Sequence, residues 1–152
     1  MATTPRPTPN PMHPPGNSVP SANWSIDQLP GLSSTDLKRL HAHGIRTTFN
    51  LLSLGHTPEK RRILASTLET HIQHINKWIA LADLARIPSV GCQHCGLLLH
   101  AGVVSPTQLV QTPIARLHRQ MLKLQVAMMQ RRDLCPTIDQ INRWVGQARR
   151  LR

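Results

Sequence analysis

The sequence predicts an all-α protein made of two tandem helical repeats that pack as one compact unit, preceded by a disordered proline-rich segment. Helix-capping sequences recur along residues 25–152, and no window alternates apolar and polar residues as a strand would. Glycine, proline and tryptophan recur in the same order when the chain is shifted by 58 or 66 residues. Residues 1–24 hold seven of the thirteen prolines and offer little apolar surface to offset the entropy of ordering.

Composition limits the classes of function. The chain has 152 residues, with 18 Lys and Arg against 7 Asp and Glu, a net charge of +11. Such an excess favours an anionic partner, and nucleic acid is the first expectation. No apolar run is long enough for a membrane helix, no signal segment is evident, and three cysteines favour a reducing compartment over a disulfide framework. We therefore expect a cytoplasmic protein without membrane contact.

Each helix expected in the first half starts at a polar capping residue. These residues are Ser25 with Gln28, Thr47, Thr57 with Pro58 behind it, and Thr70 with Gln73. A helix over residues 34–42 can end at Gly44, which suits a left-handed stop. The helix that Thr70 would open carries Trp78 and reaches Leu84. Residues 25–82 thus read as one helical repeat.

The second half repeats this order over residues 83–152. Its expected helix starts are Ser105 with Gln108, Thr112 with Pro113, and Thr137 with Gln140. At a shift of 58 residues, Gly44 falls on Gly102 and Thr47 on Ser105; at a shift of 66, the segment 75–79 falls on 141–145. Both Trp78 and Trp144 lie in this last match, and their apolar neighbours favour core packing over base stacking. A tandem duplication accounts for these matches.

Each repeat contains an apolar-Pro-small-apolar-small segment before a helix, Leu29–Ser33 and Ile87–Gly91. Proline ends the preceding helix, a small residue allows a tight reversal, and amides at the next helix start can bind an anion. This segment resembles the helix-hairpin-helix (SAM-like) motif, in which those amides hold a DNA phosphate. Ser33 and Ser89 replace one glycine each. The candidate contacts are Gly31, Leu32, Ser33, Ser34, Ser89, Val90 and Gly91, with Arg86 nearby.

The region from Ser25 to Arg152 also resembles a largely cyanobacterial family of tandem helix-hairpin-helix proteins, domain of unknown function 4332. The segments 82–96, 100–102 and 131–136 carry most of this resemblance. Related domains are described as flap-endonuclease-like, a label that reflects the helical submodule. The resemblance implies the fold and supplies no reaction.

Basic residues concentrate in the second half. Residues 83–152 hold ten basic and three acidic side chains, a net +7. Arg116, Arg119 and Lys123 are spaced to share one helix face, which favours a row of phosphate contacts. The alternative interpretation is a solvated face that meets an acidic protein.

The cysteines and histidines offer weaker candidates. Cys92, Cys95, Cys135 and His100 could hold zinc only if the fold brings Cys135 close. A redox pair at Cys92 and Cys95 is the other alternative, although no βαβ context supports it. Cys95 aligns with Leu37, an expected core position, so buried apolar thiols are the favoured interpretation. We expect no metal and no cofactor.

The acidic residues favour a non-enzymatic protein. Seven carboxylates are spread singly along the chain, and no phosphate-binding loop or nucleophile arrangement is present. The first hypothesis is a sequence-independent nucleic-acid binder, with DNA favoured over RNA. Its rival is a protein-interaction or scaffold module in which the hairpins only pack.

Overall fold

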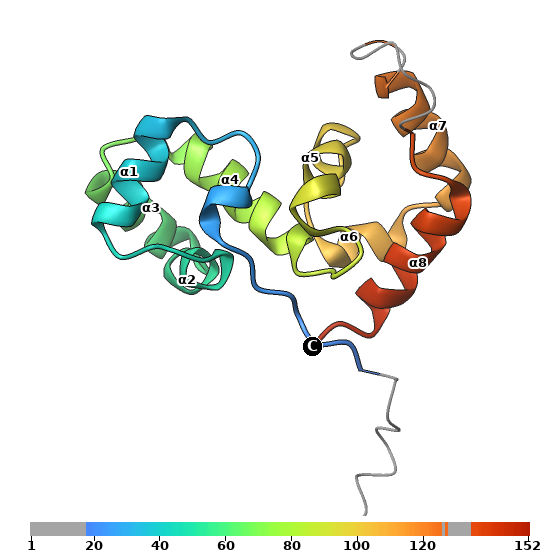
Figure 1. Ribbon diagram of the computed structural model, residues 1–152, viewed down its shortest axis with the longest axis horizontal. Helices are drawn as coiled ribbons and strands as arrows, with labels where there is room; N and C mark the ends of the chain where they lie inside the picture. Colours follow the sequence, from blue (N-terminus) through green and yellow to red (C-terminus); the bar gives the residue numbers. More distant parts are fainter. Residues whose placement is uncertain (1–17, 126, 128–134) are drawn as a thin grey trace, which may run out of the picture.

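The computed structural model describes residues 18–125, 127 and 135–152, and the all-α prediction is confirmed over these residues (Figure 1). A short 3-10 helix, η1 (Ile26–Gln28), precedes the α-helices. These are α1 (Ser34–Ala42), α2 (Thr48–Leu54), α3 (Pro58–Thr67), α4 (Ile72–Ala85), α5 (Gly91–His100), α6 (Pro106–Gln111), α7 (Ile114–Leu124) and α8 (Ile138–Arg149). The only strand-like pairings among the described residues are two isolated bridges. None of the helices described has the length and apolar character needed to span a membrane.

Helix α4 connects the two ends of the molecule. In Figure 1, α1–α3 gather around its first part, and it leads to α5 and to the end formed by α6–α8. Seven of its residues are buried, including Trp78, Leu81 and Leu84. A helix that is apolar on several faces must be covered on several sides, and α4 packs on α2, α3 and α5.

One hydrophobic core runs through both halves. Its buried members extend from Ile26 and Leu40 in the first half to Trp144 and Val145 in the second. Trp78 is 2% exposed and Trp144 1% exposed. The expectation that both tryptophans belong to the core is therefore confirmed.

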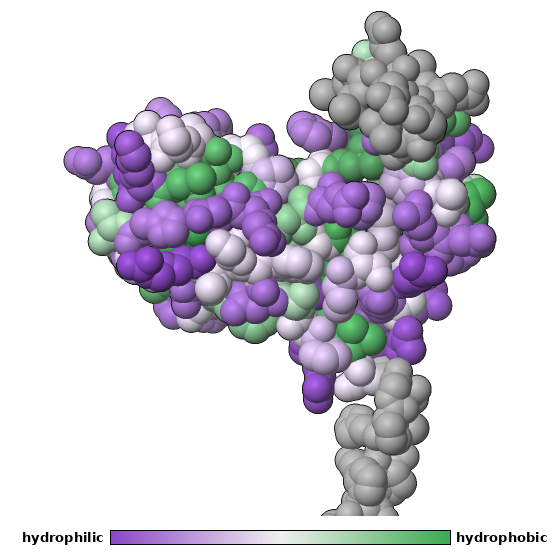
Figure 2. Space-filling view, in the orientation of Figure 1, coloured by the Kyte–Doolittle hydropathy of each residue, from purple (hydrophilic) through white to green (hydrophobic). Residues whose placement is uncertain are grey.

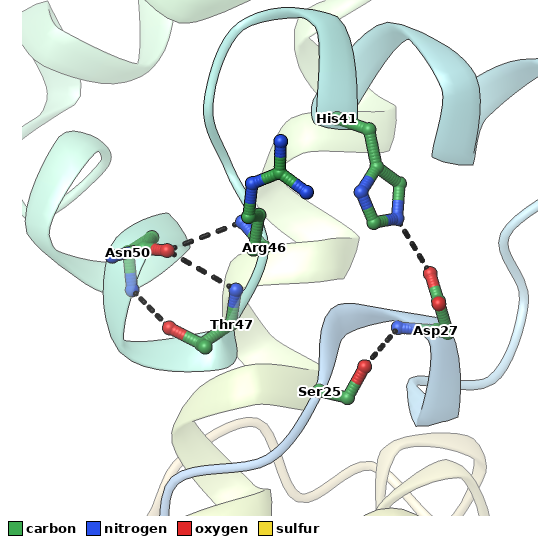
Figure 3. A network of polar contacts seen from close by, with 6 residues as sticks. All are labelled: Ser25, Asp27, His41, Arg46, Thr47 and Asn50. Carbon is green, nitrogen blue, oxygen red and sulfur yellow. Dashed lines mark hydrogen bonds and ion pairs between the residues drawn. The ribbon is translucent and has the colours of Figure 1, made fainter.

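Most of the predicted helix starts are confirmed. Thr47, Thr57, Ser105 and Thr137 each accept a hydrogen bond from the backbone N–H three residues ahead. At Thr47 the bond is reciprocal, because the Asn50 side chain accepts from the Thr47 N–H (Figure 3). Ser25 differs from its prediction: its hydroxyl accepts from the Asp27 N–H at 3.4 Å, and a 3-10 helix follows.

Two predicted caps are wrong, for local reasons. The Thr70 N–H bonds to the Ala65 carbonyl at 3.0 Å, closing α3 around Glu69, which has a positive φ of 54°. Thr70 therefore ends one helix, and α4 starts after His71 without a side-chain cap. Similarly, Thr112 ends α6, and its hydroxyl donates a hydrogen bond to the Gln108 carbonyl. Helix α7 therefore begins after Pro113.

The disordered segment predicted for residues 1–24 differs from the structure in its last part. Residues 1–17 lie outside the described residues. The Val19 N–H donates to the Arg150 carbonyl at 2.8 Å, and the Arg152 N–H donates to the Val19 carbonyl at 3.0 Å. Ala22 donates to the Arg86 carbonyl at 2.9 Å. The segment 18–24 thus finds backbone partners both at the C-terminal end and in the middle of the chain.

The turn that follows α1 recurs after α5. After α1, the Gly44 and Ile45 N–H groups bond to carbonyls at 3.0 and 2.9 Å; after α5, Gly102 and Val103 do so at 3.0 and 3.0 Å. Both glycines have positive φ, 79° and 93°. The same turn thus ends the first helix of each group of four.

Candidate nucleic-acid interface

The amides of the second hairpin, residues 87–91, are occupied within the chain. The Ser89 N–H donates to Oε1 of Gln147 on α8 at 2.9 Å. The N–H groups of Val90 and Gly91 both donate to the Ile87 carbonyl, at 2.9 and 3.0 Å. The turn and α8 therefore satisfy all three of these candidate donors within the chain.

Gly91 serves packing in this hairpin. Its φ is +53°, and a Cβ at this position would lie 3.0 Å from the Trp24 ring. The Trp24 indole N–H donates to the Ala85 carbonyl at 2.7 Å. Trp24 thus covers the second hairpin.

Arg86 is also engaged in the fold. Its Nη1 lies 2.5 Å from Asp83 Oδ1, and its Nε donates to Ser21 Oγ at 3.2 Å. Its side chain is about one-third exposed, with 29% of its surface accessible. Two of its five N–H donors are thus engaged within the chain, and these bonds favour a structural role for Arg86.

The first hairpin, residues 29–33, keeps more of its donors open. Gly31 is exposed with φ +82°, and its N–H has no hydrogen-bond partner among the described residues. A Cβ built on Gly31 would lie 3.7 Å from Lys77 Nζ, so an exposed ammonium from α4 ends beside this turn. Ser34 is exposed in the first turn of α1, whereas Leu32 packs half-buried against the core.

Ser33 is committed to capping α1. Its hydroxyl accepts from the Asp36 N–H and its N–H donates to the Asp36 carboxylate, both at 3.1 Å. This reciprocal pair satisfies two helix-start donors and places a negative charge where a phosphate would bind. The anion-binding groups left around this hairpin include the Gly31 amide, the exposed Ser34 and Lys77.

The predicted basic row lies on the exposed face of α7. Arg116, Arg119 and Lys123 are exposed, while Leu117 and Met121 on the other face are buried. None of the three cations has an ion pair or hydrogen bond to another described residue. In the space-filling view, hydrophilic side chains lie beside apolar ones at both ends of the molecule (Figure 2). The α7 row is therefore a solvated cationic surface.

The structure favours the interpretation of the three cysteines as apolar thiols. Cys95 is fully buried, and this burial raises the pKa of its thiol to about 12. Burial also raises the pKa of Cys92 and of Cys135. A reactive thiolate needs a lowered pKa, so this arrangement disfavours redox chemistry. No group of three His, Cys, Asp or Glu side chains, the candidates Cys92, Cys95, Cys135 and His100 included, could hold a metal ion in the part of the chain that the structure describes.

Two contacts of the interface have no signal in the local sequence. Lys77 reaches the first hairpin from α4, and Gln147 reaches the second hairpin from α8. Both residues are ordinary polar positions on amphipathic helices. Only the repeat alignment, which places both helices at the ends of their repeats, could have indicated that they lie near the hairpins.

Comparison with known proteins gives one finding. No curated protein and no solved structure is significantly similar to the chain. The family described as Domain of unknown function (DUF4332) matches residues 30–151, which is most of the chain. The protein therefore belongs to the family of domain of unknown function 4332.

Proposed function

We propose that this protein is a non-enzymatic module that binds nucleic acid without sequence preference, DNA in preference to RNA. The observation that carries the proposal is the row of Arg116, Arg119 and Lys123 on α7, exposed and without acidic partners among the described residues. A chain with a net charge of +11 attracts polyanions at long range. The three exposed cations on one face of α7 then supply the local contacts.

The internal correspondence supports a pair of helix-hairpin-helix repeats with different tasks. Proline-containing turns precede both α1 and α5, and the same glycine turn follows each helix. In the second hairpin, Gln147 and the Ile87 carbonyl occupy the amides, so it acts as a packing element. In the first, Gly31 and Lys77 remain accessible to one phosphate. Binding then depends on α7 and on the first hairpin.

Such contacts make binding sensitive to salt and insensitive to base sequence. Lysine and arginine that neutralise phosphates release counterions, whereas sequence is read at base edges in the grooves. The proposed groups are three flexible cations, one backbone amide and one ammonium. They can follow a phosphate backbone without distinguishing the bases.

Fluorescence anisotropy on the full chain tests the proposal. Two unrelated DNA duplexes should bind alike, and duplex RNA more weakly, with affinity falling as salt rises. Replacing Arg116, Arg119 and Lys123 by alanine should weaken binding to both duplexes and flatten the salt dependence by about one unit per lost phosphate contact. Lys77→Ala should flatten it by about one unit more.

Arg86→Ala is the matched control, because it also removes one positive charge. Its cation is held by Asp83 and Ser21, so the salt dependence should not change while the melting temperature falls. Failure to bind any duplex at low salt would refute the proposal. So would a triple α7 variant with the affinity of the unaltered protein.

The rival function, recognition of an acidic protein, is favoured by a different surface. An exposed apolar groove lies between α2 and α3, at the end of the molecule remote from α7 (Figure 1).

A further inference from the structure

The groove is formed where the end of α1 meets α2 and α3. Ile45, Leu54, Ile63 and Leu64 make its apolar lining, and His43, Lys60 and Thr67 complete it. The hollow has a volume of about 320 Å³. On α3, Lys60, Ile63 and Leu64 share one face because they lie one helical turn apart.

Two branched side chains of this groove are left in water. Ile63 is 65% exposed and Leu54 is 46% exposed. Ile45 and Leu64, at 0% and 6% exposure, form the part of the lining that belongs to the core. Exposed apolar side chains that adjoin a hollow, with polar residues around it, are typical of interaction sites.

We propose that this groove binds a short acidic amphipathic segment of a partner protein, anchored by a branched apolar side chain. The hollow is lined by apolar atoms, so a nucleic-acid backbone finds few partners in it. Its only ionisable lining residues are His43 and Lys60, and no carboxylate is among them. Glu59 precedes Ile63 by one turn but does not contribute to the lining.

The net charge of the chain favours an acidic partner over a second copy of this chain as the occupant of the groove. Two copies, each with a net charge of +11, would repel one another at any face. An acidic segment is attracted by the same charge, and Lys60 provides a local cation for one of its carboxylates. Apolar anchors at helical spacing would fill the space between Leu54 and Ile63, as in other helix-in-groove complexes.

The groove lining shares no residue with the phosphate-binding groups proposed above, which are Gly31, Lys77 and the basic row of α7. The groove is formed by α1–α3, whereas the basic row lies on α7. A peptide in the groove and a duplex on α7 should therefore bind to one molecule at the same time. The proposal goes beyond nucleic-acid binding and stands or falls separately from it.

Selection from a displayed library of random peptides on the full chain tests the proposal. The peptides enriched should combine Asp or Glu with Leu, Ile or Phe at helical spacing. Affinity of a synthetic copy of the best peptide is then measured by fluorescence polarisation. Ile63→Ser should weaken its binding by about tenfold or more, as expected for a central anchor contact. Lys60→Gln should weaken it severalfold, and less so at high salt.

Two matched control variants distinguish binding in the groove from the general effects of a lost charge or a lost exposed apolar side chain. Arg62→Gln removes an exposed cation from the same helix, and Ile138→Ser removes an isoleucine that is 47% exposed on α8. Neither residue lines the groove, so neither change should alter affinity by more than about twofold. A scrambled peptide of equal charge should bind weakly.

Several results would overturn the proposal. These are the absence of enriched peptides, enriched peptides without acidic residues or without apolar anchors, and binding that Ile63→Ser leaves unchanged. Displacement of the peptide by duplex DNA would also overturn it, because it would place the peptide on the phosphate-binding surface. Thermal unfolding of each variant checks that Ile63→Ser, at an exposed site, keeps the fold.

Discussion

His94 couples α5 to α8 through one ring contact. Its ring centroid lies 5.1 Å from that of Trp144, with the ring planes tilted by 41°. Burial beside this tryptophan lowers the pKa of His94 below its usual 6.5. The fold therefore prefers the neutral imidazole, whereas the unfolded chain binds a proton near the usual pKa.

This preference predicts a pH dependence of stability. Below pH 6.5 the unfolded state binds more protons at His94 than the folded state does. The stabilisation is complete above that pH and is lost as pH falls through the folded pKa. We expect the urea midpoint to drop between about pH 7.5 and pH 5, and His94→Gln to reduce this drop.

Urea titrations at both pH values measure the effect. The control is His100→Gln, because His100 is an exposed histidine on the same helix. That variant should show the pH dependence of the unaltered protein. An equal drop in the His94→Gln and unaltered proteins would show that His94 does not contribute.

At the scale of the element, glycine turns end α1 and α5. Gly44 and Gly102 have φ values of 79° and 93°, and a Cβ at either position would meet nothing within 4 Å. The only cost of a side chain there is the left-handed backbone conformation. The two positions therefore isolate backbone strain from packing.

Gly44→Ala and Gly102→Ala should each destabilise the protein by about 1 kcal/mol, and by similar amounts. Gly146→Ala is the control, because Gly146 lies inside α8, where a Cβ would meet only the Arg150 side chain, at 3.8 Å. Alanine there should stabilise the protein by up to about 1 kcal/mol. Chemical denaturation measures all three. Two turn variants that differ widely would contradict the equivalence of the turns.

At the scale of the whole molecule, both halves share one core. Helix α4 belongs to the first half by sequence, yet it packs on α5 as well as on α2 and α3. Trp24 joins the N-terminal segment to the second hairpin, and Val19 pairs with Leu151. The first half alone would expose one side of α4, and either half alone would lose these contacts.

We therefore expect the full chain to unfold in one transition. Helical circular dichroism and tryptophan fluorescence should give the same midpoint, because Trp78 and Trp144 lie in one core. A fragment of residues 18–90 should lack a cooperative transition, because it would expose the side of α4 that packs on α5 and small domains are only marginally stable. Two separate transitions, or a fragment that melts cooperatively, would show that the halves are independent domains.

Local sequence determined most of the helix boundaries. The predicted helix over residues 34–42 corresponds to α1, and Thr47, Thr57, Ser105 and Thr137 open helices as expected. A capping bond joins groups only three residues apart, so the nearby sequence suffices to predict it. Thr70 and Thr112 instead end the preceding helices. Such a helix end depends on the conformation of several residues.

The tertiary structure alone decided which predicted contacts remain available. The Ser89 amide donates to Gln147, which is 58 residues away. The Arg86 side chain is held by Ser21, which is 65 residues away, and by nearby Asp83. The groove around Ile63 likewise needs three helices in place. Sequence determined the all-α class, the helix starts and the recurring order of caps and turns, because these depend on local bonds and periodicity. Packing decided which donors and apolar side chains stay exposed, because their exposure depends on residues remote in the sequence.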